Sequence, residues 1–168
     1  TIAYNTQFFG SQPPKDWSVL IDPKWKGKIL LNSPKDSAGT QGFLLVLPNK
    51  YGPDFLKKLG AQNLRFSNST VTGINSVASG DVAMFIPSSH WNNTDLIAKG
   101  APVADAYPEP AMGGSEQWLG IVKGGPHPNA AALFFNFVLS SDGQTAACAD
   151  VCSSVINARK TIPLAASY

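Results

Sequence analysis

One stretch of the chain, residues 28 to 47 (KILLNSPKDSAGTQGFLLVL), most constrains how it can fold. It opens with a short apolar run, which predicts a buried strand, and continues with strand breakers at 32–34. Small hydroxyl and glycine residues then precede a second apolar run at 43–47, and they favour a helix that begins near Thr40. The stretch therefore predicts a strand, a polar turn and a helix N-terminus, in that order.

The start of this helix has the chemistry of an anion site. A helix N-terminus leaves several backbone N–H groups without partners and carries a partial positive charge. Ser37 and Thr40 add hydroxyl groups there, and Gly39 lets a ligand approach the main chain closely. The same pattern also describes an ordinary N-cap that binds nothing, and both interpretations stay open at this point.

A second stretch of the same design follows at residues 67–80 (SNSTVTGINSVASG). Ser69 and Thr70 precede an apolar helical face that ends before Gly80. Hydroxyl groups again stand where a helix is expected to begin. This second stretch is therefore a second candidate anion site.

The rest of the chain alternates predicted strands and helices. Strands are expected at 29–31, 64–66, 81–86, 103–107 and 118–122, and helices at about 40–48, 53–59, 67–80, 88–100, 129–139 and from 141 to 152. This alternation predicts an α/β fold with three layers, α/β/α, around a mostly parallel sheet. In such sheets ligands bind beyond the carboxyl ends of the strands, where both capped turns would lie.

Two helix starts are expected to depend on single capping side chains. Asp16 is the expected cap of the short turn or helix that carries Trp17, and Asn129 that of the helix through Leu139. The second helix is amphipathic, and its inward face is expected to consist of Leu133, Phe134, Phe137 and Val138. If this face is buried, Phe134→Ala should destabilise the protein by roughly 3–5 kcal/mol.

Composition excludes several classes of protein. A chain of 168 residues suits about one domain, and 14% charged residues with a net charge of +2 are typical of a globular protein. No charge block or basic stripe occurs, so neither nucleic acid nor an anionic membrane surface is an expected partner. The apolar runs are far shorter than the roughly 18 residues of a membrane span, so no stable membrane insertion is expected. The chain begins at Thr1 without methionine or signal peptide, which predicts a processed chain or a piece of something longer.

No motif for catalysis or metal binding stands out. The sequence has no G-x-S-x-G, no H-E-x-x-H, no Walker loop and no pair of C-x-x-C motifs. Ser89 and His90 are adjacent and point apart, which argues against a hydrolase triad with Asp95. We therefore expect no enzyme, no metal site and no cofactor.

Cys148 and Cys152 are four residues apart, and both a disulfide and two buried thiols remain possible for them.

Several segments resemble those of one protein family, in the same order along the chain. They are YNT at 4–6, Pro14 with Asp16 and Trp17, LIDPKWKGKI at 20–29, YGPDFLKKLGAQ at 51–62, VASGDVA at 77–83, KGAPV at 99–103 and KGGPHPNAAALFFNFVLSSDGQ at 123–144. In these segments the sequence resembles bacterial extracellular solute-binding proteins of ABC importers, family 1. It resembles more closely the branch that contains ferric iron, phosphonate, thiamine and polyamine binders.

The resemblance implies a fold like that of type II periplasmic binding proteins, with two α/β lobes and the second inserted into the first. The chain would then be the second lobe over 1–122, with hinge crossings near 3–7 and 108–118, and a returning C-terminal helical segment over 123–168. The missing first lobe would be its partner in the same protein. The family also implies export to the periplasm or cell exterior after loss of a signal peptide, and delivery of the solute to a membrane permease.

The resemblance places ligand contacts at the two capped turns, near the hinge and in the following loops. The candidate residues are Ser37, Gly39, Thr40, Ser69, Thr70, Tyr4, Asn5, Trp91 and Glu116. Helix-terminal N–H groups and hydroxyls suit a small anion such as a phosphonate, phosphate ester or carboxylate.

Three alternatives stay open. Ferric binders of this branch use a pair of adjacent tyrosines, which this chain lacks, so iron is the less favoured ligand. Polyamine binders use carboxylates and aromatic walls, for which Glu109, Glu116, Trp91 and Trp118 are available, although Trp118 also suits the core. An isolated lobe could also act as a structural or interaction module.

Overall fold

The structure is a computed structural model and describes residues 1–110 and 119–149. The chain divides into two compact units, Thr1–Ser115 and Glu116–Tyr168, and each is described by itself. The boundary expected after residue 122 falls within the second unit.

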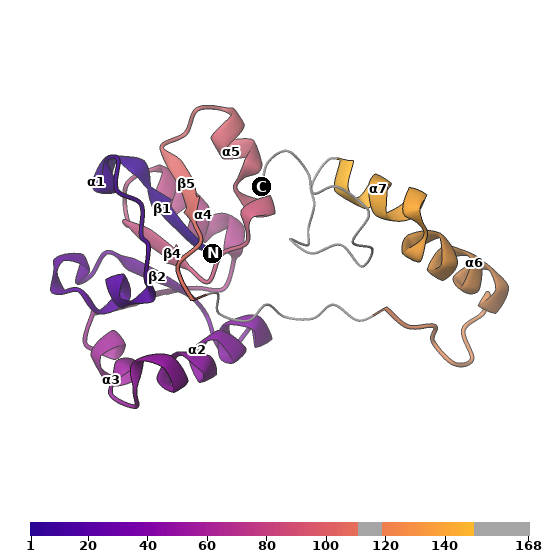
Figure 1. Cartoon of the computed structure of the whole chain (residues 1–168), viewed down its shortest axis with the longest axis horizontal. Helices are drawn as coiled ribbons and strands as arrows, with labels where there is room; N and C mark the ends of the chain where they lie inside the picture. Colours follow the sequence, from indigo (N-terminus) through magenta and orange to yellow (C-terminus); the bar gives the residue numbers. More distant parts are fainter. Residues whose placement is uncertain (111–118, 150–168) are drawn as a thin grey trace. The chain divides into compact units, whose positions relative to one another are not determined.

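The first unit contains a sheet of five strands: β1 (Ile2–Asn5), β2 (Ile29–Asn32), β3 (Arg65–Ser67), β4 (Met84–Ile86) and β5 (Val103–Ala106) (Figure 1). Its helices are α1 (Thr6–Phe9), α2 (Ala38–Tyr51), α3 (Phe55–Gly60), α4 (Thr70–Ala78) and α5 (Thr94–Ala98). The short 3-10 helices η1 (Trp17–Ile21), η2 (Pro23–Trp25) and η3 (His90–Asn92) join them. The expected cap at Asp16 is confirmed, because its side chain accepts a 2.7 Å hydrogen bond from the Ser18 N–H.

The strands lie in the order β3-β2-β4-β1-β5. Strand β2 is parallel to β3 and β4, whereas β1 is antiparallel to both β4 and β5. Strands β2, β3, β4 and β5 therefore share one direction, and their last residues meet at one edge, which we call the carboxyl edge. Because β1 runs the other way, it begins at the carboxyl edge and ends at the opposite one.

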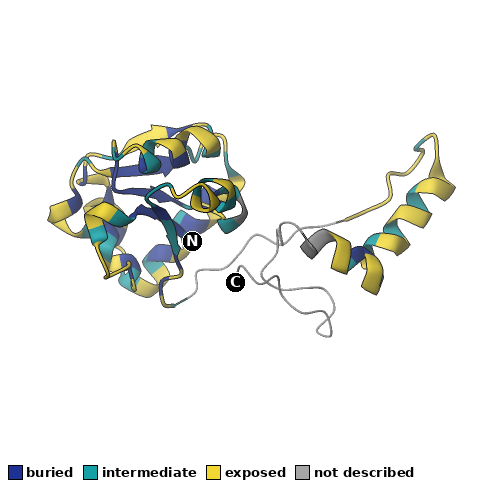
Figure 2. Ribbon diagram, turned by 90° about the horizontal axis from the view of Figure 1, so that it is seen from above, coloured by how far each residue is buried: buried dark blue, intermediate teal, exposed yellow. Residues whose placement is uncertain are grey.

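Two apolar clusters cover the two faces of this sheet. On one face, Leu31 packs with Leu47 of α2 and Phe55 of α3. On the other, Leu30 packs with Ile74 of α4. Successive strand residues point to opposite faces, so a continuous apolar run supplies both clusters. The predicted three-layer α/β/α fold with a mostly parallel sheet is confirmed, and Figure 2 shows the buried strands between exposed helix surfaces.

Helix α2 extends past its predicted end. The sequence suggested a stop near Pro48, but the helix continues to Tyr51, and the Gly52 N–H donates a 2.9 Å bond to the Pro48 carbonyl. A proline lacks only its own N–H group, so the residues that follow it can complete the last turn.

The second unit contains α6 (Pro128–Leu139) and α7 (Ser141–Ala149) in its described part. Residues 119–122 form no strand, so that part of the predicted strand is wrong. Helix α6 begins with Pro128 after His127, so the expected cap at Asn129 is also wrong; proline suits the first helical position because the missing N–H has no partner there. Cys152 lies outside the described residues, so the state of the cysteine pair stays a prediction.

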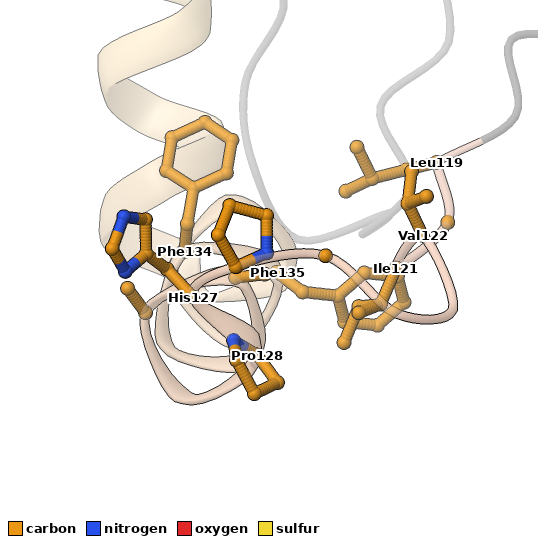
Figure 3. Close-up of a pocket in the computed structure, with 12 residues that line it drawn as sticks. Leu119, Ile121, Val122, His127, Pro128, Phe134 and Phe135 are labelled. Carbon is orange, nitrogen blue, oxygen red and sulfur yellow. The ribbon is translucent and has the colours of Figure 1, made fainter.

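Three of the four side chains of α6 that were expected to point inward are exposed, and Val138 is half-buried. Leu133 is 73% exposed, Phe134 60% and Phe137 49%, so the predicted burial is wrong for these three residues. Figure 2 shows much of this helix in the colour of exposed residues. Next to α6, an open apolar hollow of about 320 Å³ is lined by side chains that include Leu119, Ile121 and Phe135 (Figure 3). Helical periodicity predicts that a face is apolar but does not say what covers it.

Candidate ligand-binding site

The N-terminus of α2 lies at the carboxyl edge, directly after β2. The Ser37 hydroxyl accepts a 3.2 Å hydrogen bond from the Thr40 N–H and so caps the helix. This bond occupies one of the first N–H groups, and no acidic residue lies in the first turn to offset the positive helix end. Gly39 is exposed, and a Cβ atom there would come no closer than 3.8 Å to another atom. The geometry leaves the first turn open to an anion.

The N-terminus of α4 repeats this arrangement after β3. The Ser69 hydroxyl accepts a 3.3 Å bond from the Thr72 N–H, and the first turn again carries no acidic residue. The Ser33 N–H donates a 2.7 Å bond to the carbonyl of Ser67, the last residue of β3, and so links the ends of β2 and β3. The structure therefore brings Ser69 and Thr70 to the same edge as the α2 cap.

Thr40, in the first turn of α2, has a buried polar side chain. It is fully buried, and its hydroxyl oxygen has no hydrogen-bond partner in the part of the chain that the structure describes. An unpaired buried hydroxyl costs about 1–3 kcal/mol. A ligand or water molecule that reached this group and bonded to it would remove that cost, so Thr40 is the predicted contact whose side chain has an unmet hydrogen bond.

A buried carboxylate, which sequence reasoning missed, lies near the same edge on β5. The Asp105 side chain is 2% exposed, and its Oδ2 lies 2.9 Å from His90 Nδ1. Its Oδ1 accepts hydrogen bonds from Asn93 Nδ2 at 2.6 Å and from Thr1 Oγ1 at 3.0 Å. The carboxylate thus joins the loop after β4, the residue before α5 and the start of β1. The only sequence signal was one acidic residue inside an otherwise apolar strand.

Tyr4 and Asn5 do not lie with the other predicted contacts. Both are buried at the end of β1, at the edge opposite the two helix caps. Asn5 donates a 2.7 Å bond to the Val77 carbonyl and accepts one from the Gln7 N–H at 2.9 Å, so it caps α1. Burial, followed by the nearby charge of Asp105, raises the pKa of Tyr4. The antiparallel direction of β1 is the physical reason for this separation.

The remaining candidates are only partly defined. Trp91 lies in η3, which follows β4 at the carboxyl edge, but its side chain is not described. Glu116 and Trp118 fall outside the described residues. Glu109, the other carboxylate considered for polyamines, is exposed, and its N–H donates a 2.9 Å bond to the Lys15 carbonyl.

Two further properties of residues 1–110 and 119–149 concern metal binding and membrane insertion. No group of three or more His, Cys, Asp or Glu side chains suited to a metal occurs there. No helix in these ranges has the length and apolar character that a membrane span needs.

Comparison with known proteins identifies the class. The family model described as bacterial extracellular solute-binding protein matches residues 1–163. The chain belongs to this family, and its α/β fold is that of type II periplasmic binding proteins.

Two relatives are similar in sequence. An uncharacterized protein of Haemophilus influenzae is 30% identical over 136 residues, which cover 78% of this chain and 39% of the relative. A putative 2-aminoethylphosphonate-binding periplasmic protein of Salmonella typhimurium is 28% identical over 159 residues, which cover 84% of this chain and 44% of the relative.

Solved structures agree with this family. The periplasmic binding protein P5PA is 26% identical, with a TM-score of 0.73 over 99% of this chain and 55% of its own. AfuA of Actinobacillus pleuropneumoniae, solved with fructose-6-phosphate, is 24% identical, with a TM-score of 0.75 over 99% of this chain and 54% of its own, and it supports the fold alone. The chain thus spans about half the length of these proteins.

Proposed function

We propose that this chain is the second lobe, with part of the returning C-terminal segment, of a two-lobed solute-binding protein. The protein would bind a small anion, such as a phosphonate, phosphate ester or carboxylate, between its lobes. It would then deliver this solute to the membrane permease of an ABC importer, from the periplasm or the cell exterior. Family membership and coverage of about half of each relative support this assignment.

One observation carries the choice of an anion. The N-termini of α2 and α4 both lie at the carboxyl edge, after the neighbouring strands β2 and β3, and the bond from the Ser33 N–H to the Ser67 carbonyl links the ends of these strands. Neither helix has an acidic residue in its first turn, so both positive ends remain available. The unpaired buried hydroxyl of Thr40 lies in the first turn of α2. Backbone N–H groups and hydroxyls in this arrangement suit oxyanions.

The name of one relative points the same way. The Salmonella typhimurium relative is named for 2-aminoethylphosphonate. This compound carries a phosphorus oxyanion, which is the group that a helix N-terminus binds well. The family consists of transport components, and we propose that this protein binds its solute without converting it.

We place the hinge at the start of β1 and after β5, rather than near residues 3–7. Thr1 lies at the carboxyl edge, where its hydroxyl donates to Asp105, whereas Tyr4 and Asn5 lie at the other edge. Chain segments that connect two lobes across a cleft should lie on the cleft side. Closure about these segments would bring the first lobe onto the two helix N-termini.

A thermal-shift panel tests the proposal. This chain and the two-lobed protein would each be offered ethylphosphonate, fructose-6-phosphate, acetate, spermidine and ferric citrate. At about 100 times the dissociation constant, binding adds roughly 2.7 kcal/mol to the free energy of unfolding. We expect one oxyanion class to stabilise the two-lobed protein and to affect this chain little.

Other outcomes would contradict the anion assignment. Stabilisation by spermidine alone would favour a polyamine site built from carboxylates and aromatic side chains, and stabilisation by iron alone would favour a ferric binder. No response to any compound would favour a structural or interaction role.

A further inference from the structure

The carboxyl edge is electrically asymmetric. At β2 and β3 it presents two helix N-termini without acidic residues in their first turns. At β5 it holds the carboxylate of Asp105, whose side chain is 2% exposed. Asp36, in the turn before α2, is exposed, so solvent screens its charge. The two ends of one edge therefore differ in the sign of the charge that they favour.

In the described part of the chain, the cationic groups beside Asp105 are the His90 ring and the Thr1 amino group, which interacts with this carboxylate electrostatically. In the described part of the chain His90 is its ion-pair partner, and neither lysine nor arginine pairs with it. The other two donors, the amide of Asn93 and the hydroxyl of Thr1, are neutral. A carboxylate enclosed in this way acts through a lower dielectric than an exposed one, so its field extends further. Asp105 lies opposite Ala3 of β1 in the sheet, and its charge is the second cause, after burial, of the raised pKa of Tyr4.

We infer that Asp105 is a specificity-determining residue, which makes the site prefer zwitterionic solutes that carry an ammonium group beside their phosphonate or phosphate group. This inference rests on the proposed function and names its ligand class more closely. The oxyanion binds at the N-termini of α2 and α4, and the ammonium group lies toward β5. Asp105 acts through its electric field and needs no direct contact with the solute.

The strand order sets the distance between Asp105 and the bound ammonium group, and with it the expected change in affinity. Strands β2 and β5 are separated by β4 and β1. At about 4.8 Å per strand, the α2 N-terminus after β2 and the Asp105 carboxylate on β5 therefore lie about 14 Å apart. An ammonium group between them is roughly 10–14 Å from Asp105. A unit charge at this distance, with an effective dielectric constant of about 20–40, changes affinity roughly three- to fifteen-fold.

The test compares two ligands that differ by one ammonium group, 2-aminoethylphosphonate and ethylphosphonate, on the two-lobed protein by isothermal titration calorimetry. Asp105→Asn should reduce the preference for 2-aminoethylphosphonate roughly three- to fifteen-fold and leave the affinity for ethylphosphonate unchanged or higher. His90→Gln removes a neighbour of the carboxylate but keeps its charge, so the preference should persist.

Asp81→Asn is the matched control. Asp81 is exposed, lies before β4 at the opposite edge and pairs with Arg65 at 2.7 Å, so the same loss of charge should leave the preference unchanged. An unchanged preference in Asp105→Asn would overturn the inference while leaving the anion site intact. Failure of both phosphonates to bind the unaltered protein would overturn the proposed function and this inference together. If Asp105→Asn does not fold, loss of the preference in His90→Gln would equally overturn it.

Discussion

Gly73 of α4 lies directly against the ring of Phe85 in β4, because a Cβ atom at Gly73 would stand 2.5 Å from Cε2 of that ring. Both residues are buried, and no larger side chain fits between helix and strand without displacement. This close approach determines how α4 lies on the sheet, and with it the position of the Ser69 cap at the carboxyl edge.

Gly73→Ala should therefore destabilise the protein. Overpacking of a core costs about 1–3 kcal/mol, and better helix propensity returns at most about 1 kcal/mol, so we expect a net loss near 1–2 kcal/mol in urea unfolding. Gly42→Ala is the control, because Gly42 is exposed in α2 and a Cβ atom there meets nothing within 4 Å. That variant should gain about 0.5–1 kcal/mol. Equal gains in the free energy of unfolding in both variants would show that the Phe85 ring moves aside at no cost.

Thr40→Val separates ligand binding from stability. Valine has nearly the same shape but no hydroxyl, so it removes the unpaired buried oxygen and should leave the free energy of unfolding unchanged or raise it by about 1 kcal/mol. Binding of ethylphosphonate to the two-lobed protein should weaken about ten-fold, the usual effect of losing one hydrogen bond to a charged ligand. Thr72→Val, at an exposed position of α4, should change neither quantity. Unaltered affinity in Thr40→Val would remove this hydroxyl from the site.

Asp16 should make stability depend on pH in acid. Burial opposes its ionisation, but hydrogen bonds from Ser18 and from the Tyr51 hydroxyl, at 3.0 Å, outweigh burial and lower its pKa. A lowered pKa in the folded state stabilises the protein above the unfolded value of 3.8, and this contribution is lost as pH falls through the folded pKa.

The measurement is the melting temperature of three proteins between pH 2.5 and 7. Asp16→Ala should cost about 0.5–2 kcal/mol at pH 7, because it removes the cap of η1. Asp16→Asn keeps a capping oxygen, so it should lose less at pH 7, and its difference from the unaltered protein should shrink below about pH 4. A difference that stays constant with pH would mean that the charge contributes nothing.

The sequence predicted the layers and the polar starts of α2 and α4 because their causes are local. Apolar runs, strand breakers and hydroxyl residues occupy neighbouring positions, so hydroxyl groups at these helix starts, Ser37 and Ser69 among them, could be expected without knowledge of the sheet. The direction of β1 is a long-range property, so the sequence did not show that Tyr4 and Asn5 lie at the edge opposite the two helix starts. Asp105 was missed for the same reason, since its donors lie 12 to 104 residues away in the chain.

The apolar pattern of helix α6 likewise did not show whether other residues cover this face, and the last prediction concerns that face. Phe134 was expected to be buried, but it is 60% exposed, so Phe134→Ala should change the free energy of unfolding of this chain by less than about 0.5 kcal/mol. Phe55→Ala, at a position 1% exposed, should cost about 3–5 kcal/mol. Urea unfolding of both variants checks the contrast. If the two-lobed protein loses several kcal/mol with Phe134→Ala while this chain does not, residues outside this chain cover the apolar face of α6. If neither protein loses stability, that face is exposed in both.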